Sequence, residues 1–182
     1  YLLGWVIGGE ISPYAVFKTN NPNISDMGVR QSNNPEYNGK FFSSSSPRWF
    51  ESWVAEIMDF TAIKCQEHGT LAPIAQTNWV TLDGIKNPLE ARHNATNNYT
   101  SEEDWQELDM TLIQPLNGVS MFYNEHIYPY YPEFLTYHPD NTDGYYNYLD
   151  KILAKYNDKP FLITEVGIST SIGQASQEAY GR

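Results

Sequence analysis

The stretch from Pro160 to Gly167 most strongly limits what this chain can fold into. Residues Phe161 to Thr164 are apolar or β-branched, and such a run is typical of a parallel strand covered on both faces. Pro160 suits the first position of a strand, where no backbone donor is needed. In parallel α/β proteins the chemistry lies at the carboxyl ends of strands, so we predict a catalytic role for Glu165. A structural Glu that caps or pairs with a neighbouring loop is the alternative.

Three further segments resemble strands, and helical patterns separate them along the chain. The predicted strands are Leu2 to Ile7, Leu71 to Val80 and Val119 to Ile127. The predicted helices run from Ser46 to His68, from Ser101 to Asp109 and from Asp143 to Tyr156, with Ser46 as the N-cap and Pro47 at the first helical position of the first. This alternation predicts an α/β fold with a parallel sheet, right-handed crossovers and helices outside. The polar segments 12–46 and 84–100 lack a clear period, and we expect long loops there.

The first predicted helix has the clearest apolar stripe. Its members recur at helical spacing and are Phe50, Trp53, Val54, Ile57, Met58 and Thr61, whereas Glu51 lies off the stripe. Trp49 and Trp53 are therefore predicted to pack in the core, with ligand stacking as the less favoured alternative. Cys65, the single cysteine, is predicted to be a small buried side chain.

Composition bounds the class of protein and its partners. At 182 residues the chain is predicted to be a single domain, and its net charge of −11 argues against nucleic acid or an anionic membrane as partner. No apolar run is long enough to span a membrane. Its 14 tyrosines and 5 tryptophans suit surfaces that bind sugars or proteins. Glycosylation sequons at Asn23, Asn94 and Asn98 favour a secreted or extracellular protein. Because the chain starts at Tyr1, we expect a fragment or a processed product.

The predicted strands end in residues that suit the chemistry of sugars. The ends carry Glu10, Asn78-Trp79, His126 with Tyr128, and Glu165. In a parallel barrel these ends share one face, and two carboxylates would then approach across its mouth. Cleavage of a glycosidic bond needs such a pair, because one acid protonates the leaving oxygen while the other attacks or activates water. Alternation along 124–128 predicts that Asn124, His126 and Tyr128 face one way, and Glu125 and Ile127 the other.

Three motifs carry a resemblance to a known clan of enzymes. Gly8-Gly9-Glu10, His126-Ile127-Tyr128-Pro129 and Ile163-Thr164-Glu165-Val166-Gly167 resemble strands four, six and seven of a clan A glycoside hydrolase, a (β/α)8 TIM barrel. The resemblance implies that Glu10 is the acid/base and Glu165 the nucleophile of a retaining mechanism. It also implies that Tyr128 or His126 hydrogen-bonds the nucleophile.

The chain is more closely similar to glycosidase-like barrel domains of large microbial proteins. Those domains have a tyrosine-rich stretch like 126–132 and an Asn-Trp strand end like Asn78-Trp79. The resemblance implies a carbohydrate substrate, no cofactor, and substrate contacts from Asn78, Trp79, His126, Tyr128 and Tyr130. Residues 1–182 then form one partial barrel domain, with strands four to seven. The other strands are expected from the same longer protein or from another chain.

Two other functions compete with hydrolysis. Most clan A members carry Asn immediately before the acid/base, where it contacts the sugar 2-hydroxyl, but this chain has Gly9. A carbohydrate-binding or scaffold barrel without activity is therefore the main alternative. Metal-dependent hydrolysis is less favoured, because His68, His93, His126 and His138 form no recognisable ligand motif. We expect no metal site, and a hydrogen-bonding role for His126.

Overall fold

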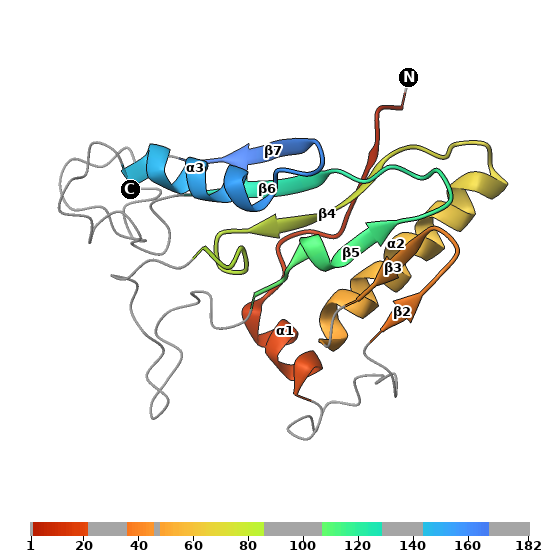
Figure 1. Ribbon diagram of the computed structural model, residues 1–182, viewed down its shortest axis with the longest axis horizontal. Coiled ribbons are helices and arrows are strands. Elements are labelled where there is room, and N and C mark those ends of the chain that lie inside the picture. The colour runs from red at the N-terminus through yellow and green to blue at the C-terminus, as the bar shows by residue number, and fades with distance from the viewer. Residues whose placement is uncertain (1, 22–35, 46–47, 86–106, 129–143, 168–182) are drawn as a thin grey trace.

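The computed structural model describes residues 2–21, 36–45, 48–85, 107–128 and 144–167. In chain order its elements are β1 (Trp5–Ile7), α1 (Pro13–Asn20), β2 (Tyr37–Asn38), β3 (Phe42–Ser44), α2 (Trp49–Glu67), β4 (Ile74–Trp79), a 3-10 helix (Met110–Leu112), β5 (Ile113–Pro115), β6 (Tyr123–Ile127), α3 (Gly144–Lys155) and β7 (Phe161–Val166) (Figure 1). Within these ranges, no helix is long and apolar enough to cross a membrane. Tyr130, the three sequons, Ser46-Pro47 and residues 101–106 of the second predicted helix lie outside the described residues.

A four-stranded parallel sheet forms the centre of the fold. Its order is β1-β4-β6-β7, so each strand pairs with the next parallel strand along the chain. These are the four strands that the sequence predicts, and each ends within one residue of its predicted carboxyl end. The structure thus has mixed α/β content with a parallel sheet of four strands among the described residues, whereas closure into a barrel stays a prediction.

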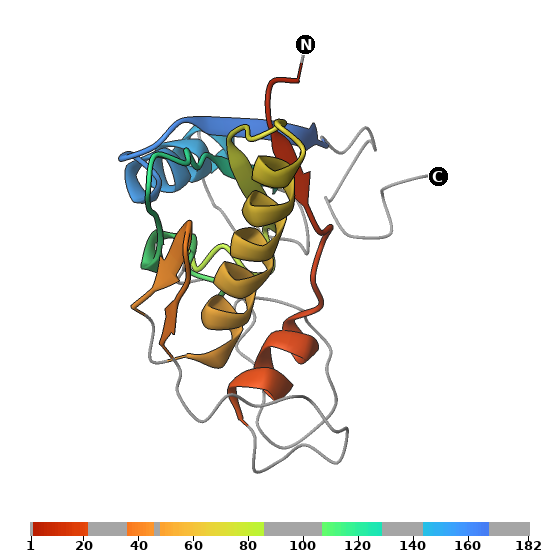
Figure 2. The same cartoon turned by 90° about the vertical axis from the view of Figure 1, so that its right-hand side faces the viewer.

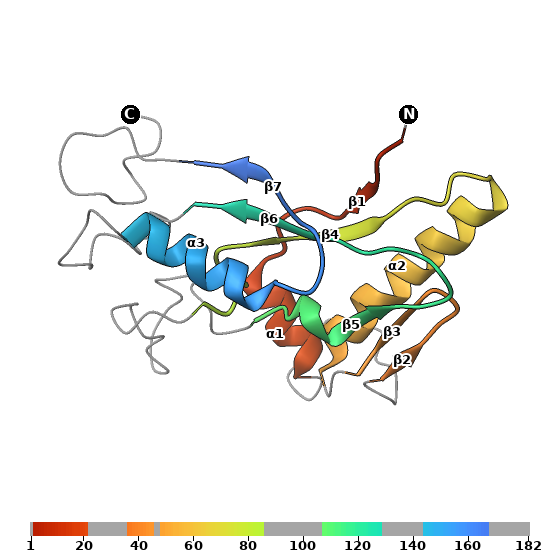
Figure 3. The same cartoon turned by 45° about the horizontal axis from the view of Figure 1, so that its top comes forward.

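The helices cover one side of this sheet and leave the other side for the strand-end residues. Figures 2 and 3 show α2 and α3 on the same side of β1, β4, β6 and β7. Their apolar faces and the sheet form the core, which includes Phe50, Val54, Met58, Ile74, Tyr123, Ile127, Tyr148, Ile152 and Tyr156. Burial of each large apolar side chain contributes roughly 1.5–3 kcal/mol to folding. This packing fixes the strands whose ends carry the site.

The N-terminal polar segment is not the long loop that its composition predicts. It contains α1, with Ser12 as the N-cap and Pro13 in the first turn, and the hairpin of β2 and β3. β3 also pairs with β5, and the resulting antiparallel sheet packs against α2. The Asp59 carboxylate on α2 holds this small sheet by accepting hydrogen bonds from the amide groups of Phe41 and Phe42. Strands this short give no readable periodicity in a sequence.

Helix α2 begins later and is rotated relative to its predicted stripe. Arg48 is its N-cap, so the predicted start at Ser46-Pro47 is wrong. Trp53 is 47% exposed and Ile57 38% exposed, and neither belongs to the core. Glu51 is instead fully buried, because Arg48 pairs with it at 2.6 Å and the Asp109 amide donates to it at 3.0 Å. Cys65 is buried, as predicted. The second predicted helix is also wrong at residues 107–109, which are not helical.

Both outer strands of the parallel sheet expose apolar side chains. In β7 Leu162, Ile163 and Val166 are 41–54% exposed, and in β1 Trp5 and Val6 are 37% and 43% exposed. Among the described residues each of these strands pairs on one side only. Edge strands with exposed apolar side chains are rare in native proteins, because such strands readily pair with further strands. The fold thus presents two edges suited to extension of the sheet.

Candidate active site

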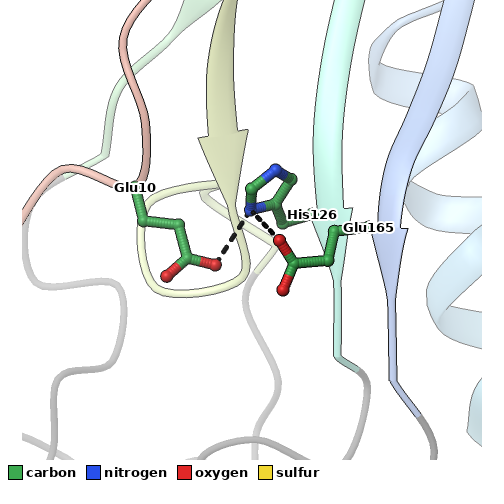
Figure 4. A group of neighbouring side chains, drawn as sticks. All are labelled: Glu10, His126 and Glu165. Atoms are coloured by element: carbon green, nitrogen blue, oxygen red, sulfur yellow. Dashed lines mark hydrogen bonds and ion pairs between the residues drawn. The ribbon is translucent and has the colours of Figure 1, made fainter.

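The carboxyl ends of the parallel strands bring Glu10, His126 and Glu165 together (Figure 4). Glu10 follows β1, His126 lies in β6 and Glu165 lies in β7. The Nδ1 atom of His126 is 2.9 Å from Oε1 of Glu10 and 3.4 Å from Oε2 of Glu165. Their side chains are 15%, 37% and 50% exposed, in the order His126, Glu10, Glu165. Three of the predicted site residues therefore form one cluster that solvent reaches.

A β-bulge places Glu165 beside His126. Up to Glu125, each β6 residue pairs in step with β7, but His126 then pairs with Glu165, so that Thr164 is an extra residue. An uninterrupted register would put Thr164 opposite His126 and turn Glu165 to the other face. Bulges commonly re-aim side chains next to active sites. The carboxylate thus reaches the cluster through an irregularity of the strand.

Tyr128 completes the surroundings of Glu165. Its hydroxyl donates a hydrogen bond to Oε1 of Glu165. Burial raises the pKa of Tyr128 to about 12, and the hydrogen bond and the charge of Glu165 add to this effect. The phenol therefore stays protonated and remains a donor through the neutral range. Gly167 allows this arrangement, because a Cβ there would collide with the Tyr128 ring.

A chain of hydrogen bonds between Thr164, Asn124, Thr77 and Gly8, here called the polar ladder, runs across the strands beside the cluster. The Thr164 hydroxyl donates to Oδ1 of Asn124 at 2.8 Å, and the Asn124 amide donates to the Thr77 hydroxyl at 3.1 Å. The Thr77 hydroxyl in turn donates to the Gly8 carbonyl at 3.4 Å. All four strand regions are thus joined on the face that carries the site. Each such bond adds roughly 0.5–1.5 kcal/mol, and together they fix how the strand ends lie relative to one another.

Trp79 supports the segment that carries Glu10. Its indole N–H donates to the carbonyl of Ile11 at 2.8 Å, and its ring is partly buried against the core. In the sheet Trp79 pairs with His126. The residue predicted to contact substrate thus borders the cluster, and its N–H is engaged with the backbone next to Glu10.

The structure does not bring Asn78 into the cluster. Asn78 is 1% exposed, and its amide donates to the Leu108 carbonyl at 3.2 Å and to the Tyr156 hydroxyl at 3.3 Å. These partners lie on the side of the sheet that the helices cover. Successive residues of a strand face opposite sides, and the sequence does not reveal which side of β4 is covered. The position of Asn78 therefore gives it a structural role in place of the predicted substrate contact.

A buried acidic cluster lies on that covered side, and no sequence motif marks it. The Asp83 carboxylate accepts hydrogen bonds from the Tyr148 hydroxyl at 2.5 Å and from the Ile85 amide at 2.6 Å. Burial and the charge of Glu125 raise the pKa of Asp83 well above its ordinary value. Through Tyr148, Asp83 anchors α3 to the sheet.

The two glycines before Glu10 differ in their environment. Gly8 has φ of +69°, and a Cβ there would collide with the Gln76 side chain, so this position needs glycine. A Cβ at Gly9 would meet nothing within 4 Å. A close approach of neighbouring atoms therefore requires glycine at Gly8 and not at Gly9.

The arrangement has the parts of a two-carboxylate catalyst. One oxygen from each glutamate and one ring nitrogen of His126 all lie within 4.8 Å of one another. In the part of the chain that the structure describes, Glu165 receives a phenol hydrogen bond and Glu10 does not. Proton transfer by one acid and attack by the other are both open to such a pair. No family model, curated protein or solved structure matches this chain significantly.

Proposed function

We propose that this chain carries the catalytic residues of a retaining glycoside hydrolase that cleaves β-linked oligo- or polysaccharides. The separation of Glu10 and Glu165 carries the proposal. Oxygens of the two carboxylates lie within 4.8 Å, which is near the roughly 5–5.5 Å of retaining enzymes and well short of the roughly 6.5–9.5 Å of inverting ones. A separation this small between the two carboxylates leaves no room for a water molecule between Glu165 and the anomeric carbon, which an inverting enzyme needs.

The proposed reaction is a double displacement. Glu10 protonates the glycosidic oxygen while Glu165 attacks the anomeric carbon and forms a covalent glycosyl-enzyme. The ionised Glu10 then removes a proton from water, which releases the sugar from Glu165. Both side chains are more than a third exposed, so a sugar can reach them.

Tyr128 supports the assignment of roles to the two acids. A protonated phenol donates to Glu165, and such a donor favours the ionised carboxylate that a nucleophile needs. Among the described residues no phenol donates to Glu10, and the contact of Glu10 within the cluster is with His126. The acid/base role therefore suits Glu10 better than Glu165.

The contacts of His126 favour a second candidate function. A protonated His126 would form ion pairs with both Glu10 and Glu165, and a site locked in this way binds sugar without cleaving it. Open space at Gly9 adds to this candidate, since no side chain there reaches a sugar. A carbohydrate-binding or scaffold barrel that lacks activity is thus the alternative.

Completion of the barrel is part of the proposal. The exposed apolar residues of β1 and β7 and the single-sided pairing of both strands support further parallel strands at both edges. Those strands come from the same longer protein or from another chain. An extracellular location is proposed from the sequons alone.

Replacement of Glu165 by Gln tests the proposal. The intact protein and its Glu165→Gln variant are assayed on a panel of aryl β-glycosides and polysaccharides, with binding measured by calorimetry. We expect hydrolysis by the parent protein, no turnover by the variant and unchanged sugar affinity. Glu56→Gln is the matched control, because Glu56 is exposed on α2 and outside the cluster. Equal turnover by parent and Glu165→Gln would exclude the nucleophile assignment, and sugar binding without any turnover would favour the inactive barrel.

A further inference from the structure

Two carboxylates approach the same ring nitrogen of His126, although one carboxylate would be enough for a hydrogen bond to it. Nδ1 of His126 lies 2.9 Å from Oε1 of Glu10 and 3.4 Å from Oε2 of Glu165. One nitrogen carries at most one hydrogen, so it makes one good hydrogen bond and leaves the second carboxylate facing the first. A cation at this point would satisfy all three groups at once.

The spacing of the three atoms suits a tetrahedral metal ion. Bonds of about 2.0–2.2 Å from Zn²⁺ to imidazole nitrogen and carboxylate oxygen place neighbouring ligands roughly 3.3–3.6 Å apart. The 3.4 Å contact of Nδ1 with Glu165 falls inside that range, and the 2.9 Å contact with Glu10 lies about 0.4 Å below it. The distance between the carboxylate oxygens is at most 4.8 Å, and both glutamates are partly exposed and have room to close it.

We propose that Glu10, His126 and Glu165 bind one divalent transition-metal ion, with Zn²⁺ as the best-suited probe, and that this state blocks glycoside hydrolysis. The ring binds through Nδ1 as the neutral tautomer with its hydrogen on Nε2. Water fills the fourth position, because the cluster is open to solvent. The block rests on the proposed function, since it follows from both catalytic carboxylates being ligands. Metal binding itself does not depend on that function.

The donor set sets the metal preference. Imidazole nitrogen suits Zn²⁺, Cu²⁺ and Ni²⁺, whereas Mg²⁺ and Ca²⁺ prefer sites made of oxygen alone. We therefore expect Zn²⁺ to bind at least 100-fold more tightly than either of them.

Calorimetry with zinc chloride on the metal-free protein tests the site. We expect one equivalent to bind, with affinity reduced at least 10-fold in both His126→Ala and Glu165→Gln. The matched control is His68→Ala, because His68 is an exposed histidine at the end of α2 and outside the cluster. Circular dichroism verifies that each variant is folded. If His126→Ala is unfolded, the Glu165→Gln variant decides the test, because the Glu165 side chain is 50% exposed and its replacement disturbs little packing. Failure of the parent protein to bind zinc, or loss of binding in His68→Ala alone, would overturn the site.

An activity assay separates this inference from the proposed function. Zinc at saturation is expected to abolish hydrolysis, and EDTA to restore it. Full hydrolysis by zinc-saturated protein would overturn the blocked state. Absence of hydrolysis from metal-free protein would count against the proposed function alone, and the calorimetry would still decide the metal site.

Discussion

Nδ1 of His126 lies 2.9 Å from Oε1 of Glu10, although 116 positions separate the two residues in the chain. The parallel order β1-β4-β6-β7 makes this contact possible, since it places the ends of β1 and β6 at one edge with only β4 between them. The same edge carries Glu165. Assembly of the candidate site is therefore a direct consequence of the strand order.

Tyr128→Phe is expected to slow hydrolysis with little effect on KM. The change removes only the hydroxyl that donates to Glu165. A hydrogen bond to a charged group is worth roughly 1.5–3 kcal/mol, which corresponds to a 10- to 100-fold loss in kcat if the bond assists the attacking carboxylate. Steady-state kinetics on one aryl β-glycoside measure this loss. Tyr14→Phe, on α1, serves as the control, and an equal loss there would refute a specific role for Tyr128.

Glu10→Ala is expected to impair poor leaving groups far more than good ones. General acid catalysis contributes roughly 10²- to 10⁴-fold, and a dinitrophenolate leaving group does not need it. Comparison of phenyl and dinitrophenyl β-glycosides measures the difference. Added azide should then give the β-glycosyl azide with Glu10→Ala, because the covalent intermediate on Glu165 still forms. With Glu165→Ala it should give the α-glycosyl azide, and the same anomer from both variants would contradict the roles assigned here.

Thr164→Val is expected to weaken the site through the bulge. Valine has nearly the shape of threonine but lacks the hydroxyl that donates to Asn124 at 2.8 Å. We expect a stability loss of about 1 kcal/mol and a fall in kcat, because the adjacent Glu165 is less well placed. Chemical denaturation and kinetics are the measurements. The control is Thr61→Val on α2, whose hydroxyl donates to a helix carbonyl away from the site. Unchanged kcat in Thr164→Val would show that the ladder does not position Glu165.

The strands and the site acids are predictable because strong local signals encode them. Apolar runs identify all four parallel strands, and polar residues at or just after their carboxyl ends mark the edge that carries Glu10, His126 and Glu165. Alternation also predicts that Glu125 faces away from His126, and the Glu125 charge acts on Asp83 on the side that the helices cover. These features depend on neighbours along the chain, so the sequence shows them directly.

The remaining features depend on contacts between distant residues. The Thr164 bulge exists only relative to β6, and no composition rule places it. The rotation of α2 follows from a buried Glu51, which Arg48 and the Asp109 amide stabilise. Asn78 faces the helices because the Leu108 carbonyl and the Tyr156 hydroxyl accept hydrogen bonds from its amide on that side. Packing against the helices, and not position in the strand, thus determines whether a residue such as Asn78 faces a ligand.

Asn78→Ala is expected to lower stability and leave KM unchanged. The change leaves the Leu108 carbonyl and the Tyr156 hydroxyl without the amide that donates to them. Such a loss in a buried place costs roughly 1–3 kcal/mol. Urea denaturation measures it, with Asn157→Ala as the control, because Asn157 makes its hydrogen bond at the exposed end of α3. A raised KM with unchanged stability would restore the predicted contact between Asn78 and substrate.

Asp83→Asn is expected to flatten the dependence of stability on pH. Burial, followed by the charge of Glu125, raises the pKa of Asp83 in the folded state. The folded protein therefore holds a proton that the unfolded chain releases, and the free energy of unfolding falls as pH rises above about 4, the ordinary pKa of an aspartate. Asparagine keeps an acceptor for the Ile85 amide and removes this titration. Asp158→Asn provides a control of opposite sign, because Lys159 and Tyr123 lower the pKa of Asp158, whose contribution is lost in acid. Urea denaturation across this range measures both slopes, and an unchanged slope in Asp83→Asn would contradict the argument.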